Sequence, residues 1–429
     1  MDQLRGLLGV GALLAIAFVL SSHKREIKIR VLIGGVLLQM TIAYLCLNFP
    51  PVVWAFTLFA QGVTKVISFA NEGITFLFGN IGDPTGPWGF IFVVRVLPVI
   101  IFFAAVMSVL YHLGVMQRVI AVVAWGLRKA LGVTGVEALS ASANIFVGQT
   151  EAPLTVRPYI AGMTKSQLMA VMTGGFATIA GSVLAAYVGI LGGESDESKV
   201  MFAKHLMTAS VMSAPAGFVM AKIMLPEVET PRHETLSTLL EQERKSVNVV
   251  DAAASGATDG MRLAANVAAM LVAFVALLAM VNWPLTALSE VNAVATWRAK
   301  YDVPVLTLQN MLGYVFTPLA WLIGAGPGDS RAFGSLLGQQ IIATEFIAYL
   351  DLSRHIKEGT MSARSCQIAA YALCGFANLP SIAIQIGGLA ALAPERRGDL
   401  AKIAPRAMMA GAMACWMTAA MAGVFIPIG

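Results

Sequence analysis

Long apolar runs, separated by short polar segments, follow one another along almost the whole chain. A run of about 20 apolar residues is long enough to cross the hydrocarbon core of a bilayer as a helix. The pattern therefore predicts an all-α membrane protein with about eight transmembrane helices. Their approximate limits are 4–21, 30–48, 88–112, 165–191, 200–225, 258–288, 364–390 and 405–427.

Composition supports a membrane protein. The chain has 429 residues, of which 57% are hydrophobic and 12% are charged. Soluble domains carry roughly 25% charged residues, and half of that fraction cannot cover a water-exposed surface. The net charge of +5 comes from Lys and Arg in short loops, without a basic stripe interleaved with aromatic residues. This distribution is typical of cytoplasmic membrane loops and excludes nucleic acid as a partner.

The charges of the loops predict an orientation. The basic segment 23–30 follows the first apolar run like a stop-transfer signal, so we expect a retained first span that ends in the cytoplasm. The segment 49–87 has a single basic residue, and the segment 194–197 is acidic, which places both outside. The polar linker 226–257 is expected inside. Residues 354–364, with three basic residues, disagree with this alternation.

Two intervals, 136–162 and 330–352, are apolar but contain several polar residues, and they are too short for pairs of full spans. Irregular backbone at membrane depth is tolerated where it is buried in protein or lines a cavity. We therefore predict two re-entrant hairpins; loops lying at the membrane surface are the alternative. The segments 51–80, 113–132 and 305–323 are predicted to be amphipathic helices at the membrane interface.

A weak internal repeat connects the two predicted hairpins. Residues 175–178 (Gly-Phe-Ala-Thr) recur as 375–378 (Gly-Phe-Ala-Asn), and each copy lies about one span after a Thr-Glu pair, at 150–151 and 344–345. Three spans lie between the hairpins, so the second hairpin is expected to enter from the opposite side. Such an inverted repeat is typical of alternating-access transporters that bind their substrate near the bilayer midplane. A channel has little use for it.

Glu151 and Glu345 are the carboxylates of the predicted hairpins. A charge within the membrane costs at least ~2.5 kcal/mol and marks a functional site by default. The alternative is a structural ion pair with an arginine such as Arg95 or Arg157. Metalloprotease, phosphate-loop and nucleophile motifs are absent from the sequence, and clustered Asp residues are not found either, so a membrane-embedded enzyme has little support.

The first hairpin also offers neutral oxygens. Gln149 and Thr150 precede Glu151 at the predicted tip, and Pro153 prevents a regular helix after it. Asn144 and Thr178 carry oxygens of the kind that suit sodium, a hard cation. For Thr178, the alternative is a hydrogen bond to its own helix.

The repeat's second copy carries a similar set. Asn378 and Ser381 flank Pro380, which is expected to kink or unwind the seventh span. An amide that both donates and accepts suits the vicinal hydroxyls of a polar solute. Phe176 and Phe376 are expected either to wall the site or to be ordinary core residues.

Three motifs together resemble those of the concentrative nucleoside transporters. They are Gly-Gln-Thr-Glu-Ala-Pro-Leu at 148–154, Thr-Glu-Phe-Ile-Ala-Tyr at 344–349, and Gly-Phe-Ala-Asn at 375–378. The family usually has Asn where Thr344 stands. The resemblance implies a bacterial nucleoside symporter coupled to sodium or protons, which assembles as a homotrimer with one substrate site in each protomer.

The resemblance also implies roles for individual residues. Three residues would contact the nucleobase, the last partly through water: Gln149, Thr150 and Glu151. Three would hold the ribose hydroxyls: Glu345, Asn378 and Ser381. Two would pack on the nucleoside: Val183 and Phe376. Sodium would be bound by the side chains of Asn144 and Thr178 and by the carbonyls of Val147 and Ile179. Leu379-Pro380 departs from the family's pattern and puts the Ser381 contact in doubt.

We expect the chain to import nucleosides across the bacterial inner membrane, driven by a sodium gradient. Proton coupling, or another small polar solute, is the alternative. The expected organisation is a group of N-terminal transmembrane helices at 1–112, a first half of the transport core at 113–257, and a second half at 258–429.

Overall fold

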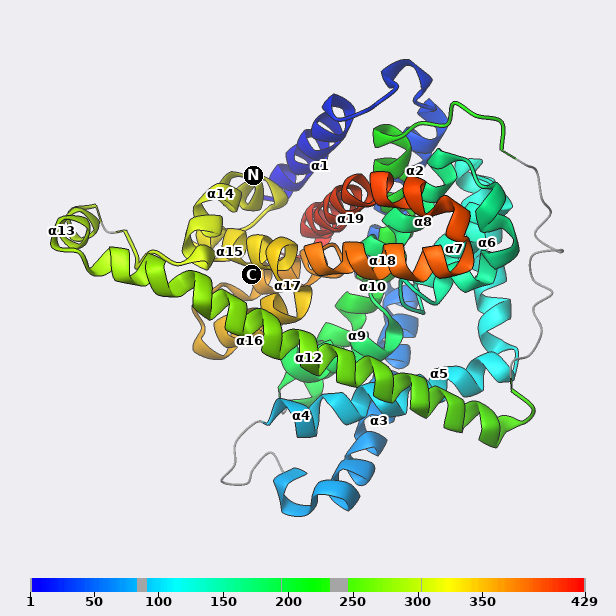
Figure 1. Cartoon of the computed structure of the whole chain (residues 1–429), viewed down its shortest axis with the longest axis horizontal. Helices are drawn as coiled ribbons and strands as arrows, with labels where there is room; N and C mark the ends of the chain where they lie inside the picture. Colours follow the sequence, from blue (N-terminus) through cyan, green and yellow to red (C-terminus); the bar gives the residue numbers. More distant parts are fainter. Residues whose placement is uncertain (1, 83–90, 194, 232–245, 302, 428–429) are drawn as a thin grey trace.

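The computed structural model describes residues 2–82, 91–193, 195–231, 246–301 and 303–427, and all regular secondary structure in these ranges is helical (Figure 1). This confirms the predicted all-α class. The first part of the chain forms α1 (Asp2–Val19), η1 (Lys24–Glu26), α2 (Ile29–Asn48), α3 (Pro50–Phe78), η2 (Gly79–Gly82), α4 (Phe92–Arg95), α5 (Leu97–His112) and α6 (Val115–Leu131). The middle forms α7 (Gly135–Asn144), η3 (Ala152–Gly162), α8 (Lys165–Ala177), α9 (Gly181–Gly192), α10 (Asp196–Met224), α12 (Val249–Glu290) and α13 (Asn292–Lys300). The last part forms α14 (Leu308–Ile323), α15 (Ser330–Ile342), α16 (Glu345–Glu358), α17 (Ala363–Ala372), α18 (Leu379–Leu392), η4 (Pro394–Arg396) and α19 (Arg397–Phe425).

Among the described residues, seven helical segments are long and apolar enough to cross a membrane. They are Ile29–Asn48, Pro50–Gly82, Phe92–His112, Lys165–Gly192, Asp196–Met224, Val249–Glu290 and Pro394–Phe425. Two of the eight predicted spans are not among them. The apolar part of α1 is shorter, at Arg5–Val19, and the predicted span 364–390 is divided into two short helices, α17 and α18.

The remaining member of the seven is the segment for which a surface helix was predicted at 51–80, and by length and composition it could also cross a membrane. Here α3 is a continuous helix whose buried residues form one narrow stripe from Ala60 to Ile74, spaced three or four positions apart. Its other face exposes large apolar residues such as Trp54 and Phe76. The exposed part of the helix also carries Gln61, Lys65 and Glu72, so it mixes apolar and polar residues. The other two predicted surface helices are found as α6 and α14, and neither is long enough to be among the seven.

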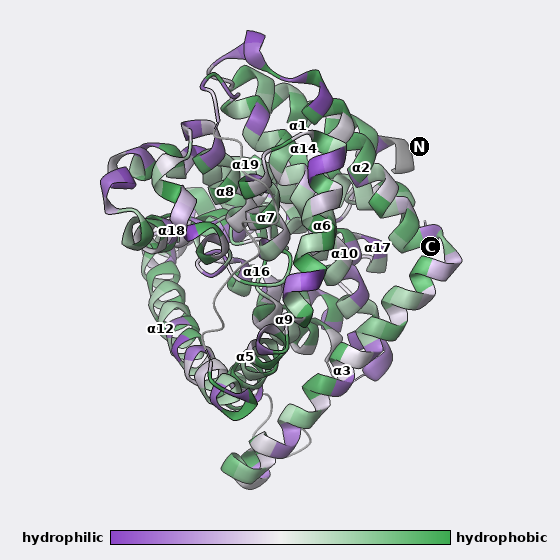
Figure 2. Cartoon of the chain, turned by 90° about the vertical axis from the view of Figure 1, so that its right-hand side faces the viewer, coloured by the Kyte–Doolittle hydropathy of each residue, from purple (hydrophilic) through white to green (hydrophobic). Residues whose placement is uncertain are grey.

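The helices divide into a buried core and an exposed periphery. In the span formed by α8 and α9, 94% of the most apolar 18-residue stretch is buried. In α12 only 6% of the corresponding stretch is buried. Figure 2 shows apolar residues along most helices, including the outward-facing α3 and α12. With 42 residues, α12 is longer than the predicted span 258–288 and measures about 63 Å. It runs across the molecule (Figure 1) and approaches α5 closely, because Gly256 and Gly260 have no side chain to separate the two backbones.

Two core spans are broken, and one of them is the seventh span, for which a kink or unwound point was predicted. The first divides into α8 and α9 around Thr178, and the second divides into α17 and α18 at residues 373–378. Pro380 does not kink a helix, which corrects the expected cause. It occupies the first turn of α18, where its missing amide hydrogen costs nothing. The side-chain oxygen of Asn378 caps this turn by accepting a hydrogen bond from the Ser381 amide at 2.8 Å.

The repeat extends far beyond four residues. The sequence α6–α7–η3–α8–α9–α10 has the same element order as α14–α15–α16–α17–α18–α19. In each half a helix precedes a hairpin, a broken span follows the hairpin, and a helix of 29 residues closes the unit. The segments α7 and η3 pack against each other, as do α15 and α16. Both intervals therefore form hairpins of two packed helical segments.

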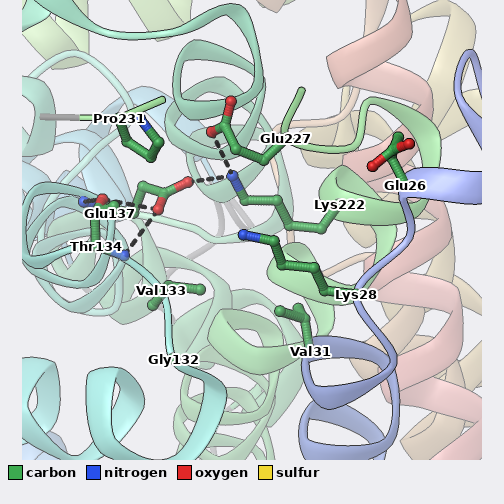
Figure 3. Close-up of a pocket in the computed structure, with 10 residues that line it drawn as sticks. All are labelled: Glu26, Lys28, Val31, Gly132, Val133, Thr134, Glu137, Lys222, Glu227 and Pro231. Atoms are coloured by element: carbon green, nitrogen blue, oxygen red, sulfur yellow. Dashed lines mark hydrogen bonds and ion pairs between the residues drawn. The ribbon is translucent and has the colours of Figure 1, made fainter. Parts of the chain in front are cut away.

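Each half is held together at one end by a polar cluster. In the first end cluster, Lys222 at the end of α10 forms ion pairs with Glu137 of α7 at 2.5 Å and with Glu227 at 3.6 Å (Figure 3). Its ammonium group also donates to Ser166 Oγ at the start of α8, at 2.9 Å. The first end cluster consists of Thr134, Glu137, Thr164, Ser166, Lys222 and Glu227.

The second end cluster joins the corresponding elements of the other half. Ser362, the N-cap of α17, donates to the carboxylate of Asp329 next to α15 at 2.6 Å. Arg364 of α17 donates to the carbonyl oxygens of Gly324 and Gly423, at the ends of α14 and α19. The second end cluster consists of Gly324, Asp329, Ser362, Arg364, Ser365 and Gly423.

The two end clusters lie at opposite ends of α1. Ser22, just after α1, donates through its hydroxyl to the carbonyl of Met224, beside Lys222 of the first end cluster. At the other end of α1, a methyl group on Gly6 would meet the carbonyl oxygen of Ala420, near Gly423 of the second end cluster. An 18-residue helix is about 27 Å long, close to the thickness of a bilayer core. The two hairpins therefore begin at opposite ends of the molecule, as an inverted repeat requires.

Candidate functional site

The two halves meet through polar side chains at their breaks. Gln149, in the turn after α7, donates from Nε2 to Ser381 Oγ of α18 at 3.3 Å. Both side chains are buried, although 232 positions separate them in sequence. The first turn of α18 therefore touches the first hairpin through Ser381.

Glu345 is the centre of a second polar group. It is 4% exposed and is the first residue of α16, with Thr344 as N-cap. One carboxylate oxygen accepts a hydrogen bond from the hydroxyl of Tyr187 in α9 at 2.8 Å, and the other accepts from Asn378 Nδ2 at 2.7 Å. A buried carboxylate is tolerated when such donors satisfy it. In the part of the chain that the structure describes, both hydrogen-bond partners of Glu345 are neutral, so the alternative of a structural ion pair with arginine does not hold for this residue.

Asn378 connects the two polar groups. Its Oδ1 caps α18 through the Ser381 amide, and its Nδ2 binds Glu345. The predicted residues Gln149, Ser381, Asn378 and Glu345 are thus brought together as one buried chain of contacts between the halves.

Tyr187 was missed by the sequence analysis. It lies four positions after Val183 in α9, so the two share a helix face, and both are buried. A tyrosine within an otherwise apolar helix, one turn from a predicted contact residue, is the signal that could have identified it.

Thr150 and Glu151 have different surroundings from Gln149. Both are exposed in the turn that leads into η3. A methyl group on Gly388 of α18 would contact the Thr150 side chain. The helix after the tip is a 3-10 helix with Pro153 in its first turn, so the irregular tip predicted from Pro153 is found.

The oxygens predicted to bind sodium lie where two breaks adjoin. The amide of Gly181 donates to the carbonyl of Phe146 at 3.0 Å, which joins the break after α7 to the break before α9. A methyl group on Gly174 would meet Asn144 Nδ2, so Asn144 lies against α8 one turn before Thr178. Val147 and Ile179 are buried at these same breaks.

Asn144 has the chemistry of a cation ligand. It is fully buried, and its Nδ2 donates to the carbonyl of Ser140 at 3.1 Å. Its Oδ1 has no hydrogen-bond partner among the described residues. The Thr178 hydroxyl donates to the carbonyl of Gly174 at 2.9 Å, which is the predicted alternative of a hydrogen bond to its own helix. The hydroxyl oxygen can still accept a hydrogen bond or coordinate a cation. Neutral oxygens of this kind fit a monovalent hard cation.

The two phenylalanines of the repeat differ. Phe176 is fully buried, with its backbone and Cβ close to Gly375 and Gly411, and is a core residue. Phe376 is partly exposed, and its amide donates to the Thr178 carbonyl at 3.4 Å. The more accessible of the two rings is therefore that of Phe376, while Val183 lies buried in the first turn of α9.

Three family models match most of the chain. The N-terminal model of the Na+ dependent nucleoside transporters matches residues 8–81, and the C-terminal model of the same family matches residues 205–423. A model described as nucleoside recognition matches residues 93–194, which contain the first hairpin.

Similar proteins are known from bacteria and animals. An uncharacterized transporter of Haemophilus influenzae is 43% identical over 100% of this chain and 99% of its own length. Sodium/nucleoside cotransporter 2 of Rattus norvegicus is 36% identical over 100% of this chain and 64% of its own length. The chain thus spans nearly all of the bacterial relative and about two thirds of the longer animal one.

Among solved structures, CNTnw in an inward-facing, substrate-bound state matches with a TM-score of 0.88 and 42% identity, over 99% of this chain and 98% of that chain. A CNTnw variant in an intermediate state matches with a TM-score of 0.89 and the same identity, over 100% of both chains. The family models, the relatives and the shared fold agree, and they indicate a multi-pass transporter and not an enzyme. The chain belongs to the family of sodium-dependent nucleoside transporters.

Proposed function

We propose that this protein is a secondary active symporter that imports nucleosides across the bacterial inner membrane, driven by the sodium gradient. The observation that carries the proposal is the buried contact chain from Gln149 through Ser381 and Asn378 to Glu345, which joins the two halves of the repeat. A solute bound there would contact both halves at once, and it would favour one arrangement of the halves over another.

The residues of this contact chain suit the two parts of a nucleoside. Glu345 offers carboxylate oxygens, and Asn378 and Ser381 offer neutral polar groups, a set that can receive and orient vicinal ribose hydroxyls. Gln149, with Thr150 and Glu151 beside it at the tip, would face the nucleobase. Phe376 and Val183 would pack on the apolar surfaces of the ligand.

Sodium would bind between the two breaks of the first half. The unpartnered Oδ1 of Asn144 and the hydroxyl oxygen of Thr178 would be side-chain ligands, with carbonyls from Val147 and Ile179. The ion would bind neutral oxygens from both breaks, including one from the turn that carries Gln149. Ordering this turn would strengthen nucleoside binding, and by linkage bound nucleoside would strengthen sodium binding equally.

The two hairpins would then enter the membrane from opposite sides, and they would move together with the broken helices when the site alternates between the two faces. The exposed apolar face of α12 is available for contact with lipid or with other protomers of a homotrimer.

The test is uptake of radiolabelled uridine by proteoliposomes that contain the purified protein. Uptake is measured under an inward sodium gradient, an inward proton gradient at equal sodium, and no gradient. We expect accumulation above equilibrium under the sodium gradient. Accumulation under the proton gradient alone would replace sodium by protons as the coupling ion. No saturable uridine, adenosine or cytidine uptake under any gradient would overturn nucleoside import.

A further inference from the structure

Gln385 is a polar side chain of α18 to which the proposed function assigns no role. It is 1% exposed and lies one turn after Ser381. Its Nε2 donates to the carbonyl of Met172 in α8 at 3.0 Å. Its Oε1 has no hydrogen-bond partner among the described residues. A buried acceptor without a donor is destabilising, so this oxygen calls for an explanation.

The orientation of the Gln385 amide is fixed by its partner. A carbonyl oxygen accepts hydrogen bonds and cannot donate, so the nitrogen of Gln385 must face Met172. The Oε1 atom is therefore an acceptor that faces away from Met172.

Gln385 lies beside Gln149. A methyl group on Gly175 would be 2.5 Å from Gln385 Nε2 and 3.0 Å from Gln149 Cβ. Both glutamines thus approach the same face of Gly175. The hydrogen-bond partner that Gln149 has in the structure, Ser381, precedes Gln385 by one turn on the same helix. Gln149 therefore lies beside two α18 residues that carry acceptors, Ser381 and Gln385, and the Gln385 acceptor is unpartnered among the described residues.

We propose that Gln385 is a positioning residue that acts through Gln149, and this inference rests on the proposed function. When a ribose hydroxyl binds Ser381 Oγ, it competes with the Gln149 amide for that oxygen. The amide then donates to Gln385 Oε1. The exchange keeps the Gln149 nitrogen hydrogen-bonded, and it holds the side chain in one orientation toward the nucleobase. Gly175 is the residue that leaves room for the exchange, because any side chain there would displace the Gln385 amide.

The test uses equilibrium binding of radiolabelled uridine to the full-length, detergent-solubilised protein at saturating sodium. Gln385→Met keeps the length and shape of the side chain and removes its polar atoms. We expect the Kd for uridine to rise roughly 5- to 10-fold, the effect of losing one buried neutral hydrogen bond. Gln149→Ala should weaken binding by at least as much. If Gln385 acts through Gln149, the double variant binds no more weakly than Gln149→Ala alone.

Gln39 provides a matched control. It is also fully buried in a helix, its Nε2 donates to Thr418 and to the Met212 carbonyl, and its Oε1 is also unpartnered among the described residues. Gln39→Met and Gln385→Met should both lower thermal stability, but Gln39→Met should leave the Kd for uridine unchanged. Gly175→Ala should reproduce the weaker binding of Gln385→Met.

Three results would overturn the inference while the wild-type protein binds uridine. The first is an unchanged Kd for uridine in Gln385→Met. The second is a double variant whose rise in Kd is the product of the rises in Gln149→Ala and Gln385→Met. The third is a rise of the Kd in Gln39→Met as large as that in Gln385→Met. Failure of the wild-type protein to bind any nucleoside would instead overturn the proposed function, and the inference with it.

Discussion

The two Thr-Glu pairs of the repeat have the same sequence and different environments. Thr344 caps α16 through a hydrogen bond from the amide of Ile347, and Glu345 is buried behind it. Thr150 and Glu151 lie exposed in a turn that continues as a 3-10 helix. A shared motif therefore places one carboxylate within the protein and the other at its surface. The difference arises from the helix that follows: a capped α-helix in one half and a proline-containing 3-10 helix in the other.

The two halves also differ in how their buried oxygens are satisfied. In the second half, both oxygens of Glu345 accept hydrogen bonds from protein donors. In the first half, the side-chain oxygens of Asn144, Gln149 and Thr173 have no partner in the described parts of the chain. The carboxylate of the second half is thus satisfied by the protein itself. Unpartnered neutral acceptors also occur in the second half, on Gln340 and Gln385, but in the first half that of Asn144 lies where two breaks adjoin, which is the chemistry that a cation completes. The following predictions test this contrast.

The largest effect is expected at the first end cluster. Lys222→Met removes the cation between Glu137 and Glu227 and leaves two carboxylates in a nearly buried site. Breaking a buried ion pair in this way costs about 3–5 kcal/mol. We expect a clear fall in the thermal unfolding temperature of the solubilised protein, measured by intrinsic fluorescence.

Two controls refine this prediction. Arg364→Met in the second end cluster removes hydrogen bonds to neutral carbonyls, so it should lower the unfolding temperature less. Lys28 lines the same cavity of about 40 Å³ as Lys222 but is exposed, and Lys28→Met should have almost no effect (Figure 3). Equal destabilisation by Lys222→Met and Lys28→Met would show that the first end cluster is not held by its buried ion pairs.

The second prediction concerns Glu345. The substitution Glu345→Gln keeps the shape of the side chain but replaces one carboxylate oxygen by an NH2 group. That NH2 group then faces the hydrogen-bond donor of either Tyr187 or Asn378. Hydrogen bonds to a charged group contribute about 1.5–3 kcal/mol. We expect Glu345→Gln to lower the kcat/KM for uridine uptake on the order of 100-fold. Tyr187→Phe, which removes one of the two donors, should have a smaller effect in the same direction. Unchanged uptake by Glu345→Gln would remove this carboxylate from the substrate site.

Much of this architecture could be predicted from the sequence, because apolar runs, polar breaks and loop charges are local features. The broken spans, the two hairpins and the all-α class follow from them. Local patterns did not separate finer alternatives. A mixed polar and apolar face predicted a surface helix at 51–80, and α3 also has the length and apolar composition of a membrane span. Pro380 predicted a kink or an unwound point in the seventh span; the span is unwound at residues 373–378, and Pro380 lies in the first turn of the helix that follows.

The site was predictable where polar residues interrupt apolar runs, as with Gln149, Glu345, Asn378 and Ser381. Their mutual contacts were not, because they depend on how distant helices pack. Tyr187 and Gln385 show this limit. Each lies in a largely apolar helix one turn after a predicted site residue, Val183 or Ser381, which is a local signal. The carboxylate or carbonyl that each contacts lies on a distant segment and is not a local feature.

The third prediction addresses the unpartnered oxygens of the first half. Asn144→Ala removes the buried Oδ1 and should raise the sodium concentration for half-maximal uridine uptake about 10-fold, because the ion then has one ligand fewer. Thr178→Val should act in the same direction, while Thr178→Ser keeps the oxygen and should have little effect. The measurement is uptake against sodium concentration at fixed uridine. An unaltered sodium response in Asn144→Ala and Thr178→Val would place the coupling ion elsewhere.

The smallest effect is expected at Glu151, the surface counterpart of Glu345. Its carboxylate is exposed, so water screens its charge and can take over a hydrogen bond that the substitution removes. We expect Glu151→Gln to change the KM for uridine about 3-fold, with little change in kcat, since such a group contributes roughly 0.2–1 kcal/mol. Uptake kinetics of Glu151→Gln and Glu345→Gln, measured side by side, give the ratio of the two effects. An effect at Glu151 as large as that at Glu345 would mean that the exposed turn closes over the nucleoside and excludes water during transport. In that case the two Thr-Glu pairs would be equivalent in the loaded protein, and the contrast between the halves would be a property of one conformation.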